Sequence, residues 1–243
     1  MIISIITVCY NSSATIQDTI ASVNKQSYPD IEHVFIDGGS TDGTVEIIRN
    51  LSKRNTTIIS EKDQGIYDAM NKGLQKAKGE IVTYLNSDDF YYDSDVIATV
   101  AKSFRHHDIV YGDINIVEYE RTNKVVRHWK AGEKSRFGVW LGWHPPHPAF
   151  FIKKSLMKSL GGFNLRYQIA ADYDLMTRSL RIGKSRYVPK LMTALRVGGV
   201  STSGLRQIIK SNIECTISLI SQGNIFALFT VCLKLVRKSF QLQ

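Results

Sequence analysis

Short apolar runs alternate with amphipathic segments through the first hundred residues, and this alternation leaves few folds open to the chain. Four runs rich in Ile, Val and Thr have the length of strands: 2–8, 33–37, 57–60 and 81–85. The segments between them place apolar residues at helical spacing, as at Ile16, Ile20 and Val23. Strands that alternate with helices form an open, doubly wound and mostly parallel sheet. The sequence therefore predicts an α/β fold.

The pattern changes after residue 105. Residues 109–119 and 124–129 are predicted to form an antiparallel hairpin, and residues 171–182 a helix. The last forty residues read as two amphipathic helices that meet near Gly223. We therefore expect a second half of mixed structure, followed by C-terminal amphipathic helices.

Charge is divided unevenly along the chain. The formal net charge of +9 is the sum of −6 in residues 1–100 and +15 in residues 101–243. Such a division suggests that the two halves meet different partners. A basic, non-catalytic nucleic-acid-binding protein is one alternative, and it needs its charge on one aromatic-studded face. We expect no nucleic-acid partner, because the acidic half carries the polar residues that suggest a pocket.

The cysteines and the apolar runs indicate a cellular setting. Cys9, Cys215 and Cys232 form neither a CxxC pair nor a zinc spacing, which favours a reducing, cytoplasmic location. No leader peptide is visible, and the longest apolar run, 225–233, is too short to span a membrane. We expect a protein that is soluble or lies peripherally on the inner face of the cell membrane.

Polar side chains follow each of the four predicted strands. They are Thr7 to Asn11, Asp37, Glu61 to Asp63 and Asn86 to Asp89. The carboxyl ends of parallel strands share one edge of a sheet, where ligands bind. Asp and Asn are also common turn residues. Because four strand ends share this character, one pocket explains the pattern better than four unrelated turns.

Asp88 and Asp89 are adjacent carboxylates at the end of a strand, and they repel each other unless a cation or hydrogen bonds neutralise them. Oxygen ligands of this kind suit Mg²⁺ or Mn²⁺. The alternative is a helix-capping Asp beside a solvated one. The chain has neither a GxxxxGK[ST] nor a GxGxxG phosphate loop. A metal would therefore carry the charge of a bound phosphate.

Four motifs in this order resemble glycosyltransferase family 2, the inverting enzymes of the Rossmann-like GT-A fold. They are TVCYN at 7–11, DGGSTDGT at 37–44, GIYDAMNKG at 65–73 and LNSDD at 85–89. The similarity covers the first ninety residues and extends to about residue 200. The third motif looks most like bacterial enzymes that build capsular, colanic-acid-type and lipopolysaccharide chains.

The resemblance implies a nucleotide-sugar pocket whose residues come from the four strand ends and from the helical segment 65–79: Thr7, Tyr10, Asn11, Asp37, Asp63, Asn71 and Asp88. Among these, Asp37 would contact the base and Asp88 the ribose. Asp89 would bind the Mn²⁺ or Mg²⁺ that bridges the diphosphate. The chain departs from the family at two positions, with Asn86 where many members have Asp and Met70 where many have Arg.

Sugar transfer with inversion needs one base for the acceptor hydroxyl. Members of the family usually carry an acidic residue followed by Asp at the start of the predicted helix. Ala171 replaces the first of these, so Asp172 is our candidate for the catalytic base. The alternative for Asp172 is a helix cap. His147 lies between two prolines and is expected at the nucleotide-sugar site, with a structural role as its alternative.

The resemblance therefore implies an inverting, metal-dependent transferase that moves a sugar to a glycan or lipid-linked acceptor in bacterial surface polysaccharide synthesis. By the same resemblance we expect a UDP-linked sugar, with a GDP-linked sugar as the alternative. Residues 1–204 would form the GT-A catalytic domain, with a nucleotide-binding half (1–105) and an acceptor-binding half (106–204). The tail, 205–243, would contact a membrane surface or a second copy in a homodimer. A sugar-1-phosphate nucleotidyltransferase is the alternative enzyme, but it needs a Gly-rich phosphate loop after the first strand.

Overall fold

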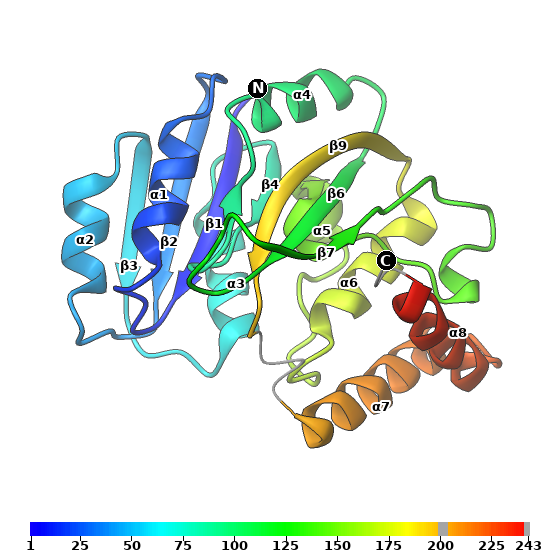
Figure 1. The fold of residues 1–243 in the computed structure, drawn as a ribbon. Coiled ribbons are helices and arrows are strands. Elements are labelled where there is room, and N and C mark those ends of the chain that lie inside the picture. Colours follow the sequence, from blue (N-terminus) through cyan, green and yellow to red (C-terminus); the bar gives the residue numbers. More distant parts are fainter. Residues whose placement is uncertain (199–203, 241–243) are drawn as a thin grey trace.

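A single twisted sheet runs through the computed structural model, which describes residues 1–198 and 204–240 (Figure 1). Nine described strands pair in the order β3-β2-β1-β4-β8-β6-β9-β5, and β7 pairs with β6 outside this path. The strands are β1 Ile3–Cys9, β2 Ile31–Asp37, β3 Asn55–Ser60, β4 Ile81–Tyr84, β5 Phe90–Tyr91, β6 Ile109–Val117, β7 Val125–Trp129, β8 Phe150–Lys153 and β9 Ser185–Arg196. The α-helices are α1 Ile16–Asn24, α2 Thr44–Leu51, α3 Ile66–Lys76, α4 Val96–Ser103, α5 Lys154–Ser159, α6 Ala171–Ile182, α7 Leu205–Ser221 and α8 Ala227–Phe240.

Strands β1 to β4 form the parallel part of the sheet that the alternating pattern predicts. Every residue of β1 and β2 is buried, because the apolar, β-branched side chains of both faces pack beneath helices. The register sets Cys9 beside Asp37 and Asp37 beside Ser60. The carboxyl ends of these strands therefore lie at one edge, where the sequence places its polar residues.

The second half extends the same sheet in a mixed arrangement. Strand β8 enters antiparallel between β4 and β6, and β6 forms the predicted antiparallel hairpin with β7. Strand β9 runs parallel to β6, curves across the sheet and pairs near its end with β5, where Ala194 lies opposite Phe90. This pairing brings Arg196 to the end of β4, although more than one hundred residues separate them in the chain.

The two C-terminal helices, α7 and α8, form at the predicted positions and lie at the end of the molecule opposite α2 (Figure 1). Their buried side chains join Tyr173 of α6 in one apolar cluster that includes Cys215, Leu219 and Val231. They are therefore packed on the domain. None of the described helices combines the length and the apolar composition needed to cross a membrane.

Candidate functional site

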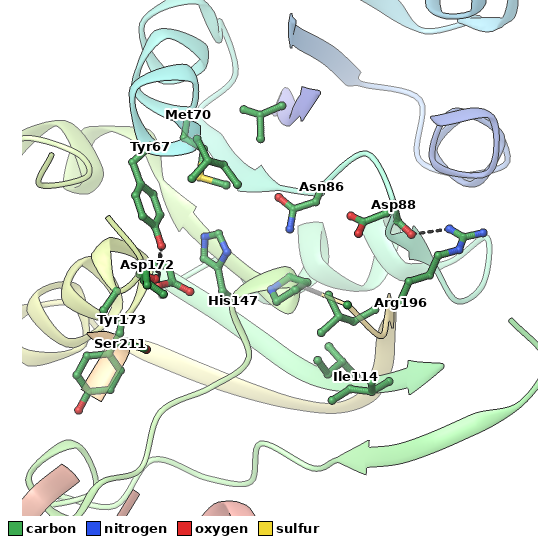
Figure 2. Close-up of a pocket in the computed structure, with 18 of the residues that line it drawn as sticks. Tyr67, Met70, Asn86, Asp88, Ile114, His147, Asp172, Tyr173, Arg196 and Ser211 are labelled. Carbon is green, nitrogen blue, oxygen red and sulfur yellow. Dashed lines mark hydrogen bonds between the residues drawn. The ribbon is translucent and has the colours of Figure 1, made fainter. Parts of the chain in front are cut away.

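A cavity of about 1580 Å³ opens along the carboxyl edge of the parallel strands and continues to α6, α7 and α8. Figure 2 shows side chains from both halves of the chain around it. Of the residues predicted from the sequence, six line the cavity: Tyr10, Asn11, Asp63, Asp88, His147 and Asp172. Four do not: Thr7, Asp37, Asn71 and Asp89.

Tyr10, Asn11 and Asp63 surround the loop that follows β2. Asn11 adopts a left-handed backbone conformation with φ of 47°, which Asn tolerates better than most residues. Its side-chain oxygen accepts a hydrogen bond from the Thr41 N–H at 3.0 Å, which joins the two loops. A methyl group on Gly38 would lie 2.8 Å from Oδ2 of Asp63 and 3.4 Å from the Tyr10 ring. The Asp63 carboxylate and the Tyr10 ring therefore both lie close to the Gly38 backbone at this corner of the cavity.

Thr7 and Asp37 are buried behind the cavity wall. The Thr7 hydroxyl lies 3.0 Å from Nε2 of His33. Asp37 accepts hydrogen bonds from the hydroxyls of Ser40 and Ser60 and from two backbone N–H groups. Burial acts to raise the pKa of Asp37, but these hydrogen bonds outweigh it and lower the pKa below its ordinary value. Asp37 is therefore ionised, and its carboxylate holds the loop after β2 in place.

Asn71 holds the two halves of the chain together. Its side-chain amide accepts a hydrogen bond from the Phe163 N–H and donates one to the Phe163 carbonyl, both at 2.9 Å. The pairing reproduces the hydrogen bonds of a neighbouring strand. Asn71 thus attaches α3 to the loop that leads toward α6.

Asp88 and Asp89 have different surroundings although they are adjacent. Asp88 is half-buried and faces the cavity, whereas Asp89 is fully buried and lies behind it. Oδ1 of Asp89 accepts a hydrogen bond from the Arg196 N–H at 3.3 Å. Burial raises the pKa of both carboxyls, and the charge of Asp88 adds to the effect on Asp89. The family resemblance implied that Asp89 binds the metal, but the Asp89 side chain is not among those that line the cavity.

The fit of these residues to a divalent cation is partial. No group of three His, Cys, Asp or Glu side chains that could hold a metal occurs among the residues that the structure describes. Mg²⁺ needs fewer protein ligands than that, because one or two carboxylates, substrate phosphates and water complete its coordination. A cation would also offset the burial that raises the Asp88 pKa. Asp88 therefore fits such an ion as a single protein ligand.

Arg196 closes the same end of the cavity. Its guanidinium donates to the carbonyl oxygen of Asp88 (Figure 2). It also forms an ion pair with Asp18 and lies over the Phe90 ring. In the sequence, Arg196 followed by Gly198 and Gly199 predicts a segment that closes over a diphosphate, with an ordinary loop as the alternative. Residues 199–203 of that segment lie outside the described part of the chain. Arg196 itself anchors the turn that carries the two carboxylates.

Asp172 lies in the first turn of α6 and points into the cavity (Figure 2). The Tyr67 hydroxyl lies 3.1 Å from its Oδ1. The His147 ring lines the same cavity and stacks on Tyr84, with ring centroids 5.8 Å apart. Burial lowers the pKa of His147, and the negative charge of Asp172 only partly opposes this. The centre of the cavity therefore pairs a carboxylate with an imidazole held neutral by burial.

Glu214 of α7 fixes the segment from which α6 begins. The buried carboxylate accepts hydrogen bonds from the N–H groups of Gln168, Ile169 and Ala170 at 3.1, 2.8 and 2.9 Å. These residues immediately precede the helix that carries Asp172. The sequence prediction missed this contact. One feature of the sequence could have pointed to a structural role for Glu214: it is the only acidic residue after Asp174.

Comparison with known proteins agrees with this geometry. Residues 4–161 match the family model described as Glycosyl transferase family 2. The chain belongs to this family. A PGL/p-HBAD biosynthesis glycosyltransferase from Mycobacterium bovis is 36% identical over 182 residues, which cover 72% of this chain and 68% of that protein. A Mycobacterium tuberculosis protein with the same description has the same identity and coverage.

Solved structures show that this family 2 member has the GT-A fold. The S. aureus TarS 1-349 structure superposes with a TM-score of 0.64 at 19% identity, covering 90% of this chain and 66% of that chain. The mannosyltransferase PcManGT from Pyrobaculum calidifontis gives a TM-score of 0.61 at 20% identity, covering 98% and 74%. The chain thus spans about two thirds to three quarters of these relatives. The predicted family and fold class are confirmed.

Proposed function

We propose that this protein transfers a sugar from a nucleoside diphosphate sugar to an acceptor hydroxyl, with inversion at the anomeric carbon. The observation that carries the proposal is that one cavity is lined by Asp172, by the strand-end residues and by aromatic side chains of the second half. Family 2 membership favours this activity over nucleotidyl transfer or nucleic-acid binding.

The donor would lie along the strand ends. Tyr10, Asn11 and Asp63 offer an aromatic face and polar groups for a base and ribose. S. aureus TarS has been solved with UDP-GlcNAc, and PcManGT with GDP-Man and Mn²⁺. These complexes support a nucleotide-sugar donor, and we propose a uridine diphosphate sugar. The corner of the cavity lined by Tyr10, Asn11 and Asp63 would hold the uracil.

Asp88 would hold the Mn²⁺ or Mg²⁺, in place of Asp89, because only Asp88 reaches the cavity. A bound divalent cation supplies charge neutralisation to a diphosphate leaving group. The chain itself keeps this carboxylate in place through the contact of Arg196 with the Asp88 backbone.

Asp172 would act as the base. Its carboxylate takes the proton of the acceptor hydroxyl as that oxygen attacks the anomeric carbon from the face opposite the diphosphate. The new C–O bond forms as the bond to the diphosphate oxygen breaks, so one carboxylate suffices and the configuration inverts. His147 is neutral in the same cavity and can hydrogen-bond a sugar hydroxyl without adding charge.

The acceptor would occupy the part of the cavity formed by the second half. Trp129, Trp143 and Tyr173 line it, together with Arg127 and Lys234. Aromatic faces suit sugar rings, and the positive charges of Arg127 and Lys234 suit an anionic group. We propose a glycan or lipid-linked acceptor.

The biological setting follows from the acceptor. We propose a role in bacterial surface polysaccharide synthesis at the cytoplasmic side of the membrane. The mycobacterial relatives are described by their role in PGL/p-HBAD biosynthesis. Within the chain, 1–204 would be the catalytic domain and 205–243 the tail that meets a membrane or a second copy.

The test uses the native protein and Asp172→Asn with a panel of nucleotide sugars and Mn²⁺. Donor hydrolysis identifies the nucleotide sugar without an acceptor, because water replaces the hydroxyl. With that donor and an acceptor, Asp172→Asn should reduce transfer by at least about 10²-fold while UDP binding stays unchanged. Transfer at the native rate by this variant would remove Asp172 from the role of base.

A further inference from the structure

Helix α7 exposes a continuous apolar stripe. Leu205, Ile209, Ile213, Ile217 and Ile220 follow one another at intervals of three or four residues, which places them on one face of a helix. Each keeps between 51% and 74% of its side-chain surface exposed. The stripe extends for about 22 Å along the helix axis. Isolated exposed apolar residues are common, but an aligned set of five indicates an interaction surface.

The connection between α7 and α8 enlarges this surface. Ile225, Phe226, Leu228 and Phe229 are between 60% and 87% exposed. They occupy the corner where α8 begins, at the end of the molecule away from α2 (Figure 1). We call the stripe and this corner together the apolar platform. Two exposed phenylalanines beside branched aliphatic side chains are typical of a surface that enters a lipid interface.

The charge around the apolar platform decides between partners. The described residues that form α7 and α8, 204–240, include five basic residues (Arg206, Lys210, Lys234, Arg237 and Lys238) and one acidic residue, Glu214. Glu214 is buried and its carboxylate accepts three backbone hydrogen bonds. These two helices therefore carry a net charge of +4, and their one acidic side chain is buried.

We propose that the apolar platform docks on a membrane that contains anionic lipids. The aliphatic and phenylalanine side chains would enter the boundary between headgroups and acyl chains, and the surrounding Lys and Arg residues would face anionic headgroups. A second copy of the chain is the competing occupant. It would bring the same excess of positive charge to the interface, whereas an anionic bilayer complements it.

Other faces of the same helices line the cavity. Ile208 and Cys215 of α7 and Lys234 and Leu235 of α8 contribute to its wall. Docking would therefore hold the acceptor side of the cavity close to the lipid surface. This consequence rests on the proposed function, whereas the docking surface itself does not.

Vesicle co-sedimentation of the full chain tests the proposal. Vesicles of phosphatidylcholine with 30% phosphatidylglycerol should bind the native protein at least about fivefold better than pure phosphatidylcholine. The double variant Ile213→Glu/Ile217→Glu should bind at least about tenfold less. Phe226→Ser/Phe229→Ser probes the corner independently. Leu51→Glu on α2 is the matched control, an exposed apolar side chain at the opposite end of the molecule.

Two results would overturn the proposal. One is equal binding of the native protein and both double variants to anionic vesicles. The other is that the native chain does not bind vesicles but sediments as a dimer, and that the double variants sediment as monomers. That result would assign the apolar platform to a second copy of the chain. Donor hydrolysis by every variant is measured in the same preparations. Because none of the platform residues is among those that line the cavity, failure of docking with intact hydrolysis leaves the proposed transferase activity standing.

Discussion

The phenolic oxygen of Tyr67 lies 3.1 Å from Oδ1 of Asp172 and 2.6 Å from the carbonyl oxygen of Ile169. One hydroxyl thereby connects α3, in the acidic half of the chain, to the start of α6 in the basic half. Burial raises the pKa of Tyr67 and the charge of Asp172 raises it further, so the phenol stays protonated and donates. Tyr67 is therefore a positioning residue for the carboxylate that we propose as the base.

Tyr67→Phe should lower kcat for sugar transfer by about tenfold, because the lost hydrogen bond to a charged group is worth about 1.5 kcal/mol. The donor KM should stay within twofold of the native value, since Tyr10, Asn11 and Asp63, which we propose to contact the nucleotide, are unchanged. Steady-state kinetics with the donor from the hydrolysis screen provides both numbers. An unchanged kcat, or a rise in KM alone, would contradict a positioning role.

Glu214→Gln should weaken the anchor of α6. The amide keeps one acceptor oxygen but turns a donor toward backbone N–H groups that need acceptors, which we expect to reduce the free energy of unfolding by about 2 kcal/mol. It should also reduce kcat, because the hydrogen bonds that fix residues 168–170, just before the helix that carries Asp172, become weaker. Urea unfolding and transfer kinetics measure the two effects.

Thr216→Ala is the matched control on the same helix, since the one bond of the Thr216 hydroxyl within the described residues goes to the carbonyl of Asn212 in α7 itself. It should change kcat by less than about twofold. If both variants reduced kcat equally, the contact between Glu214 and the start of α6 would not be the cause.

The two adjacent carboxylates should respond differently to the same substitution. Asp88→Asn should weaken UDP binding in Mn²⁺ by at least about tenfold, whereas Asp89→Asn should change it by less than about threefold. The reason is that only Asp88 reaches the cavity. Calorimetric titration at a fixed MnCl₂ concentration compares them. The reverse order would return the metal to Asp89, as the family resemblance implied.

His33 should make the fold sensitive to mild acid. Burial lowers its pKa from 6.5 to about 3, so between these values the unfolded chain binds a proton that the native chain does not. Stability should therefore fall as the pH falls below 6.5, by about 2 kcal/mol between pH 7 and pH 5. His33→Asn should lack this component. Urea unfolding of both proteins at the two pH values isolates it, and identical pH dependences would refute the assignment.

Local patterns were sufficient for much of the fold. The strands β1 to β4, the hairpin of β6 and β7, and helices α6 to α8 lie where spacing and turn residues predict them. Strand β8 was not predicted, because Phe150–Lys153 is short and its apolar run fits a helix or a strand equally well. Its pairing between β4 and β6 is what makes it a strand.

The family could be predicted from the resemblance of four sequence motifs. The parallel half of the sheet and the edge where polar residues gather follow from side-chain periodicity and turn chemistry, which act over a few residues. Which of those polar residues face the cavity depends on how the folded chain packs. Asp88 and Asp89 are chemically alike and adjacent, yet the pairing of β9 with β5 buries one and leaves the other accessible. Tyr67 and Glu214 acquire their roles in the same way, because their partners lie far away along the chain and are brought close only by packing.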